Sequence, residues 1–327
     1  MLLFDKSYNN IVLKYIVPLC AYSVPYSKIR PNALRTILTT KVRRITVISP
    51  KQICFHFDKD DLLKALINDI EQFYIRTLLQ GEAIRGIYAG TKDKCINWNI
   101  VTNYYYAYFL SGLFLRLCHR GTFYFDSKTQ TDVKQIISIF TPQNQNIVIK
   151  NNYFFKIDLN ENDLEYTLTL YESSKMTHEL VWEKINELLD EIKSSATKPS
   201  DEYTILESIS IVNRHKKPIY PSQLRNIVNY QPYYGIKEIE RKYSAPSILN
   251  YEDHWLSSII EFENGRSDDE QKQINLFTAY VRYLYTYTFN LINEYIERRG
   301  RKSGILSAIN KNREHKITAP RSVFTYN

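Results

Sequence analysis

Three residues in the stretch "PSQLRNIVNYQPYYG", residues 221–235, have side chains that suit phosphate chemistry. Metal-free cleavage of RNA needs a base for the proton of the ribose 2′-hydroxyl, a cation for the charged phosphorane, and an acid for the leaving oxygen. Arg225 supplies the cation, the polar Asn226 follows it directly, and Tyr230 lies about one and a half helical turns further on. The candidate catalytic residues are therefore Arg225, Asn226 and Tyr230.

Tyr230 is an unusual residue for this role. A tyrosine has a solution pKa near 10, so it donates a hydrogen bond to phosphate but is a poor base at neutral pH. Three interpretations stay open: the three residues cleave RNA, they bind nucleic acid without cleaving it, or they are structural or face a partner. Two interpretations are also open for Tyr233 and Tyr234, just beyond Tyr230: they stack on bases, or they pack the loop.

At this stretch the chain resembles HEPN domains, which are all-helical bundles and in many cases ribonucleases of bacterial immunity and toxin systems. Their site is an arginine, usually followed directly by a polar residue, then a histidine, with four to six residues between the arginine and the histidine. Arg225 and Asn226 match the beginning of this pattern, and Tyr230 stands where the histidine is expected. The stretch "NYYYAYFLSGLFLRL" looks like the Tyr-Tyr-Ala helix of many HEPN proteins, and its place before a β insertion is similar to the YaaC-like branch.

The resemblance covers about residues 60–120 and 175–300. It implies a protein of a bacterial defence or toxin system that binds RNA and cleaves it without metal. The alternative is a non-catalytic subunit of a multiprotein antiphage defence complex that docks a nuclease or ATPase partner. A homodimer or another protein partner is expected in either case.

Other chemistries find little support in the sequence. The chain has 9 glycines and lacks the glycine-rich phosphate loops and the nucleophile-elbow pattern. Its four cysteines and six histidines do not fall at zinc spacings, so we expect free thiols in a reducing cytoplasm and no metal or cofactor. Two Glu-x-Lys triplets, at 240–242 and 270–272, are typical of helix surfaces and are not interpreted as metal sites.

Charge is distributed unevenly along the chain. Eight basic residues and no acidic residue lie between Ser7 and Phe57, and eight basic residues with one acidic residue lie between Arg298 and Arg321. Since the net charge of the whole chain is +8, the middle carries a net negative charge. Basic segments attract phosphate backbones, or they cover the acidic middle or a partner, or they serve only solubility. The nucleic-acid-binding candidates are Arg43, Arg44, Arg298, Arg299, Arg301 and Lys302.

The periodicity of the sequence predicts a mainly α fold: a HEPN-like helical bundle with a small antiparallel β-meander and an N-terminal hairpin. "VRRITVISPKQICFHFD" is typical of a hairpin, and the apolar residues after "DKDD" recur at helical spacing. The stretch 98–118 is close to membrane-spanning length, but it contains asparagines, tyrosines and an arginine. A helix that is apolar on most sides within a large protein is typical of a central core helix, and we interpret this stretch in that way. We expect no membrane association.

The meander is expected at about 121–172, from the runs "GTFYF", "IISIF", "NIVIK", "NYFFKIDL" and "LEYTLTLYE". Helices are expected at 177–195 with Thr177 as N-cap, from Pro221 and Ser222 onward, over "PSILNYEDHWLSSIIEFE", and over a long stretch ending at Gly300. The expected organisation is a basic N-terminal segment with the hairpin at 1–57, a helical domain at 58–300 that contains the meander, and a basic C-terminal arm at 301–327.

Overall fold

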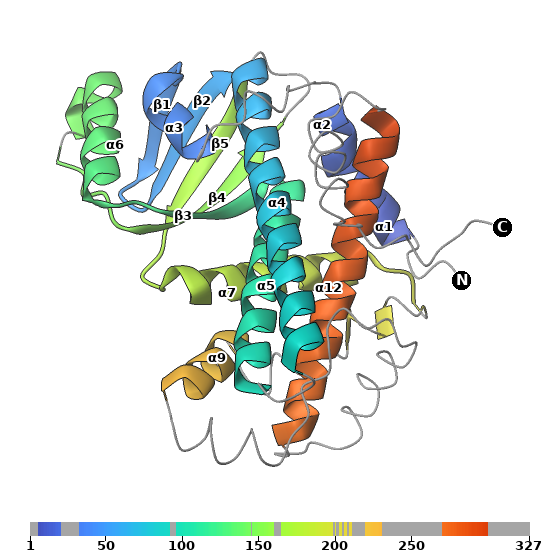
Figure 1. Ribbon diagram of the computed structural model, residues 1–327. Coiled ribbons are helices and arrows are strands. Elements are labelled where there is room, and N and C mark those ends of the chain that lie inside the picture. The colour runs from blue at the N-terminus through green and yellow to red at the C-terminus, as the bar shows by residue number, and fades with distance from the viewer. Residues whose placement is uncertain are drawn as a thin grey trace.

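The protein is mainly helical, with one small β-sheet (Figure 1). The computed structural model describes residues 6–20, 33–91, 96–144, 146–159, 165–198, 200, 203–204, 206–207, 209–210, 220–230 and 270–299. The expected helix over "PSILNYEDHWLSSIIEFE", the cap at Gly300 and the C-terminal arm lie outside these residues.

The helices of the described part follow one another along the chain in this order: α1 (Lys6–Ile11), the π-helix η1 (Val12–Ile16), α2 (Val17–Cys20), α3 (Ala33–Thr40), α4 (Lys59–Thr91), α5 (Ile96–Leu117), α6 (Ser127–Phe140), the 3₁₀ helix η3 (Pro142–Asn144), α7 (Thr177–Ser195), α9 (Tyr220–Tyr230) and α12 (Glu270–Arg299). The strands are β1 (Arg44–Ser49), β2 (Gln52–Asp58), β3 (Arg120–Tyr124), β4 (Asn152–Asp158) and β5 (Glu165–Glu172).

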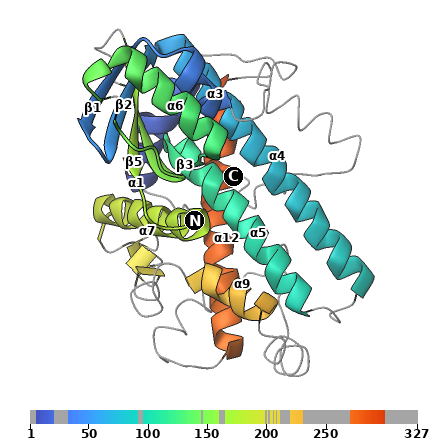
Figure 2. The same ribbon diagram turned by 90° about the vertical axis from the view of Figure 1, so that its left-hand side faces the viewer.

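Helix α5 is the centre of the helical part, as its near-uniform apolar sequence predicted. It contacts α4, α7, α9, α12 and β3, and Leu110, Leu113 and Phe114 are fully buried. Figure 2 shows α4 and α5 side by side with α12 behind them, and α9 next to the lower half of α5. Among the described residues, no helix is long and apolar enough to cross a membrane.

The sheet has the strand order β1-β2-β5-β4-β3, and all of its pairs are antiparallel. In its register Ile45, Phe55, Leu168 and Ile157 lie next to one another across four strands, and all four are buried. Alternate residues of these strands form the other, more polar face, as expected for a sheet with one covered side. Helix α6 contacts α3 and β1, and in Figure 1 it lies to the left of the sheet.

The predicted N-terminal hairpin is confirmed as β1 and β2, but it does not stand apart. Strand β2 pairs with β5 along its whole length, from Gln52 opposite Tyr171 to Asp58 opposite Glu165. The hairpin and the three later strands therefore form one sheet, and the boundary expected after residue 57 falls within β2, just before its last residue, Asp58. Sequence patterns could not show this, because strand pairing joins segments that are far apart in the chain.

The prediction of a continuous meander is wrong in two places. The run "IISIF" lies in α6 rather than in a strand, and no strand forms over "NIVIK" among its described residues. Val133 and Ile137, one helical turn apart, are both buried, and the Asp126 carboxylate accepts a hydrogen bond from the Thr129 backbone N–H. An N-cap and a buried helical stripe outweigh the strand preference of β-branched residues here.

The predicted cap of α7 is also wrong by one residue. The N-cap is Met176, whose side chain makes no capping bond, and Thr177 is the first helical residue. The Thr177 hydroxyl instead donates to the side-chain oxygen of Asn152, 2.9 Å away on β4. The start of α7 is thus fixed by the sheet, which places the next residue, His178, toward α5.

Candidate functional site

Arg225 and Tyr230 face different surroundings on α9. Arg225 is half-buried, whereas Asn226 is exposed and Tyr230 is 72% exposed. Residues five apart on an α-helix point about 140° away from each other, since each residue turns the helix by about 100°. The structure therefore does not bring Arg225 and Tyr230 together on one phosphate-sized site.

Arg225 points toward α5. Its guanidinium carbon lies 5.3 Å from the ring centre of Tyr104 and 5.9 Å from that of Tyr105. Its Nε is buried and has no hydrogen-bond partner. No carboxylate of the described residues is within ion-pair distance of this guanidinium. Within the described part of the chain, the positive charge of this half-buried side chain is therefore not neutralised by an acid.

His178, in the first turn of α7, can accept a proton and lies close enough to this charge to be influenced by it. Its Nδ1 lies 2.7 Å from the Tyr104 hydroxyl, and its ring lies 4.5 Å from that of Tyr108. Burial lowers the pKa of His178, and the nearby Arg225 charge lowers this pKa further. The imidazole is therefore neutral at pH 7, which is the form that takes up a proton.

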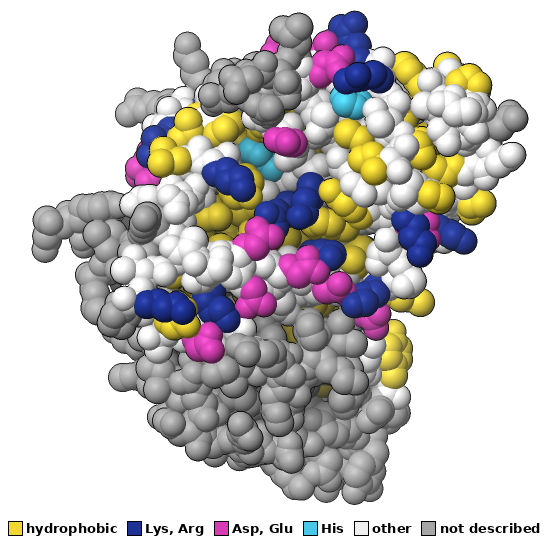
Figure 3. Space-filling view, turned by 180° about the vertical axis from the view of Figure 1, so that it is seen from behind, with side chains coloured by type: hydrophobic (Ala, Val, Ile, Leu, Met, Phe, Trp, Pro, Cys, Tyr) yellow, Lys and Arg dark blue, Asp and Glu magenta, His cyan; other side chains and the backbone are white. Residues whose placement is uncertain are grey.

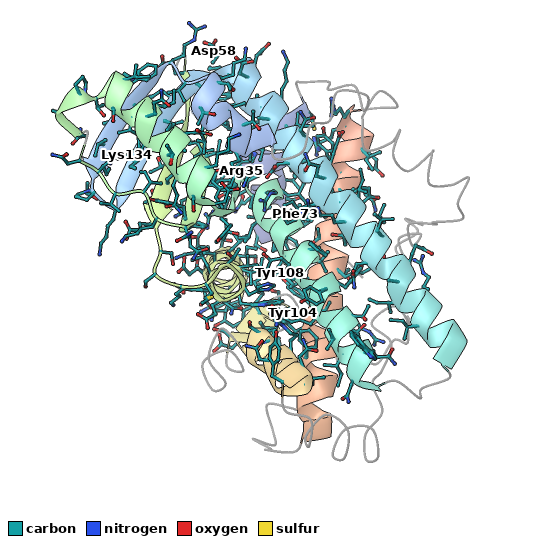
Figure 4. All side chains as sticks on the ribbon, turned by 60° about the vertical axis from the view of Figure 1, so that its left-hand side comes forward. Arg35, Asp58, Phe73, Tyr104, Tyr108 and Lys134 are labelled. Atoms are coloured by element: carbon teal, nitrogen blue, oxygen red, sulfur yellow. The ribbon has the colours of Figure 1, made fainter. Side chains whose placement is uncertain are left out.

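Tyr104 joins the three helices at the site. It is 1% exposed, and the Trp182 indole N–H of α7 donates to its hydroxyl over 3.4 Å. Ser222 of α9 also hydrogen-bonds to this hydroxyl. Burial raises the pKa of Tyr104, so the hydroxyl stays protonated at neutral pH. In Figure 4, which views α7 along its axis, Tyr104 and Tyr108 of α5 lie beside that helix.

The cluster of Arg225, His178 and Tyr104, which we call the Arg225 site, brings together a cation, a neutral imidazole and a protonated phenol. In the tautomer with its proton on Nδ1, His178 donates to the Tyr104 oxygen, and Nε2 is the free acceptor. Because the Arg225 charge acts on His178, an anion held by Arg225 would lie in the neighbourhood of the imidazole. This arrangement suits acid–base chemistry on a phosphate.

Sequence reasoning missed His178, because a search for a histidine shortly after an arginine cannot find one on an earlier helix. The only signal near it is the amphipathic pattern of α7, which reveals the helix but not what its first turn faces. The tyrosine-rich part of α5, noted for its resemblance, is what brings the two residues together.

Most of the nucleic-acid-binding candidates within the described residues are engaged with other side chains. The Arg43 Nε donates to Asp58 over 3.0 Å, Arg44 pairs with Glu165 at 3.3 Å, and Arg298 pairs with Glu294 at 2.8 Å. Arg299 is half-buried and hydrogen-bonds to the Tyr295 hydroxyl. Figure 3 shows basic and acidic side chains intermixed on the face that it views. Acidic residues of the middle thus neutralise part of the basic ends, while Arg301 and Lys302 lie outside the described residues.

The described part of the chain holds no group of three or more histidine, cysteine or acidic side chains that would bind a metal ion. Cys20, Cys54 and Cys118 are free thiols, as expected, and Cys95 lies outside the described residues.

Comparisons with protein-family models, with curated proteins and with solved structures find no match to this chain.

Proposed function

We propose that this protein binds RNA at Arg225 and cleaves it without a metal ion, with His178 as the base. The observation that carries the proposal is the Arg225 guanidinium, which forms no ion pair with an acid of the described residues and acts on a neutral, tyrosine-bonded imidazole. The residue types agree with the resemblance to HEPN domains, but the histidine comes from α7 instead of from position 230. The HEPN-like fold and a role in bacterial defence are part of the same proposal.

The reaction would follow the ordinary course of metal-free RNA cleavage. Arg225 binds the scissile phosphate, and Nε2 of His178 takes the proton of the adjacent 2′-hydroxyl. The 2′-oxygen bonds to phosphorus, the bond to the 5′-oxygen breaks, and a water molecule protonates the departing 5′-oxygen. Arg225 stabilises the charge that develops on the phosphorane. The products are a 2′,3′-cyclic phosphate and a 5′-hydroxyl, and Tyr104 acts as a positioning residue for the imidazole.

The test is an RNA-cleavage assay in excess EDTA with the wild type, Arg225→Ala and His178→Gln. The wild type should leave 2′,3′-cyclic phosphate ends, and both variants should lose roughly 10²–10³-fold in rate. Lys134→Ala is the control, because it removes an exposed positive charge on α6, far from Tyr104 in Figure 4. Cleavage that survives in Arg225→Ala, or a folded wild type that neither cleaves nor binds RNA, would contradict the proposal.

The pH dependence provides a second readout. Because the pKa of His178 lies below its usual value near 6.5, the rate should rise with pH on the acid side and level off before neutrality. Arg225 contributes to that lowering, so the His178 pKa measured by NMR should be higher in Arg225→Met than in the wild type. An unchanged His178 pKa would mean that the two groups do not share one site.

A second candidate function, docking of a protein partner by a non-catalytic subunit, is favoured by a different observation. Exposed apolar side chains lie on β1, at the end of α6 and in the segment after it, and α6 contacts β1. They are Ile48, Ile139, Phe140 and Val148. Figure 3 shows hydrophobic side chains on the face that it views. The salt dependence of binding distinguishes the two functions. The affinity for phosphate falls steeply as the salt concentration rises, whereas the affinity of an apolar protein interface does not.

A further inference from the structure

Trp98 is an exposed aromatic residue in the first turn of α5. Its side chain is 66% exposed, whereas Trp182 of the Arg225 site is fully buried. Tryptophan is highly buried on average, and an exposed indole is a face on which a base can stack. The first turn of α5 contains no acidic residue that would repel a phosphate backbone.

Trp98 lies on the same side of α5 as the Arg225 site. Trp98 and Tyr105 are seven residues apart, which is about two helical turns, or about 10 Å along the axis. Tyr105 is the residue whose ring lies 5.9 Å from the Arg225 guanidinium. Helix α9 contacts α5 and lies beside its lower half in Figure 2. A strand bound at Arg225 can therefore continue along α5 to Trp98.

We infer that the substrate is single-stranded RNA, held with its scissile phosphate on Arg225 and with a neighbouring base stacked on Trp98. This inference rests on the proposed function. Bases in a duplex are stacked inside it, whereas those of a single strand turn outward and stack on aromatic side chains. Such stacking does not depend on base identity, so the contact selects strandedness and not sequence.

The experiment measures the affinity of 2′-O-methyl RNA, which cannot be cleaved because its attacking hydroxyl is blocked. Single strands and duplexes of the same sequence are compared by fluorescence anisotropy over a range of salt concentrations. The proteins are the wild type, Trp98→Ala, Trp98→Phe, Arg225→Ala and, as a control, Tyr124→Ala. Tyr124 lies on the edge strand β3 and is 53% exposed, so it matches Trp98 as an exposed aromatic residue away from the site.

Trp98→Ala should weaken single-strand binding roughly 5- to 100-fold, Trp98→Phe much less, and Tyr124→Ala not at all. The salt slope should not change in Trp98→Ala, because no phosphate contact is lost. In Arg225→Ala the slope should fall by about 0.7, the value for one phosphate contact on a single strand.

Normal binding by Trp98→Ala, together with weakened binding by Arg225→Ala, would overturn this inference and leave the proposed function standing. Equal losses for duplex and single strand in Trp98→Ala would overturn it as well. If the folded wild type binds neither RNA at any salt concentration, the proposed function itself fails.

Discussion

Two clusters of the molecule contain the same residue types, an arginine, a histidine and a tyrosine, and use them differently. The second cluster joins η1, β3 and α7, and its arginine is Arg120. The Arg120 guanidinium donates to Glu191 over 2.8 Å and to the Tyr15 hydroxyl over 3.3 Å. His119 packs edge-on against the ring of Tyr15. The hydrogen bond from Arg120 lowers the pKa of Glu191, which shows that the pair is charged.

The carboxylate is the difference between the clusters. Glu191 neutralises Arg120, so that charge serves to hold a strand, a helix and the N-terminal segment together. Arg225 lies against two tyrosine rings and near a neutral histidine, and it forms no ion pair with an acid of the described residues. The comparison teaches that the residue opposite an arginine decides whether its charge stabilises the fold or remains free for a ligand.

The largest expected effect comes from giving Arg225 a carboxylate. Tyr105→Glu places an acid next to the guanidinium and should lower the cleavage rate roughly 10²–10³-fold, as removal of the cation would. Tyr105→Gln, similar in size but neutral, should retain clearly more activity. Both are measured as initial rates in EDTA, with circular dichroism to confirm folding. Equal cleavage rates of the Glu and Gln variants would contradict the conclusion that a carboxylate decides the role of the arginine.

The converse change removes the carboxylate from the second cluster. In Glu191→Gln the buried Arg120 loses its charged partner, so the free energy of unfolding should fall by about 2–3 kcal/mol. This is less than for a fully buried pair, because the Glu191 side chain is half-exposed. Urea denaturation measures the loss, and the cleavage rate per folded molecule should not change. Glu187→Gln, in an exposed pair with Lys184, is the matched control and should cost under about 1 kcal/mol.

The third prediction concerns acid stability and His119. Burial lowers its pKa to about 3, and the charges of Lys14 and Arg120 add to this effect. Since a histidine in an unfolded chain has a pKa near 6.5, only the unfolded state binds the proton between these values. Stability is thus complete above pH 6.5 and falls as the pH drops through this window, by up to about 1.4 kcal/mol per pH unit.

The variant that tests this contribution is His119→Asn. His119 has a positive φ of 56°, a conformation that asparagine tolerates well, so the backbone should be preserved. Between pH 6.5 and pH 4 the variant should lose less stability than the wild type in urea titrations at each pH. Parallel curves for the two proteins would show that His119 is not the group that titrates.

The smallest effect is expected for Tyr230→Phe. The hydroxyl of Tyr230 is on an exposed side chain away from the Arg225 contacts, so the cleavage rate should change by less than about twofold. Initial rates with the same RNA are sufficient for this measurement. If Tyr230→Phe lowers the cleavage rate as much as His178→Gln does, then Tyr230 takes part in the reaction and the site lies on the exposed side of α9.

The local pattern of the sequence was sufficient to predict many of the helices and strands. The hairpin, the core helix and the amphipathic stripe of α7 follow from periodicities of two and 3.6 residues, which each segment carries by itself. Helix α6 shows the limit of this reasoning. Ile136 and Ile137 suit a strand as residue types, but the cap at Asp126 and the burial of Val133 and Ile137 favour a helix.

For the candidate site, the sequence by itself determined that Arg225 lies on a helix, that α5 is rich in tyrosine, and that the ends of the chain are basic. Only the tertiary structure decided which charges are neutralised and which groups meet. Arg43 and Arg44 pair with acidic residues of β2 and β5. Arg225 instead lies against the middle of α5 and near the first turn of α7. The physical reason is that helix packing and strand pairing set distances between residues that the chain itself leaves far apart.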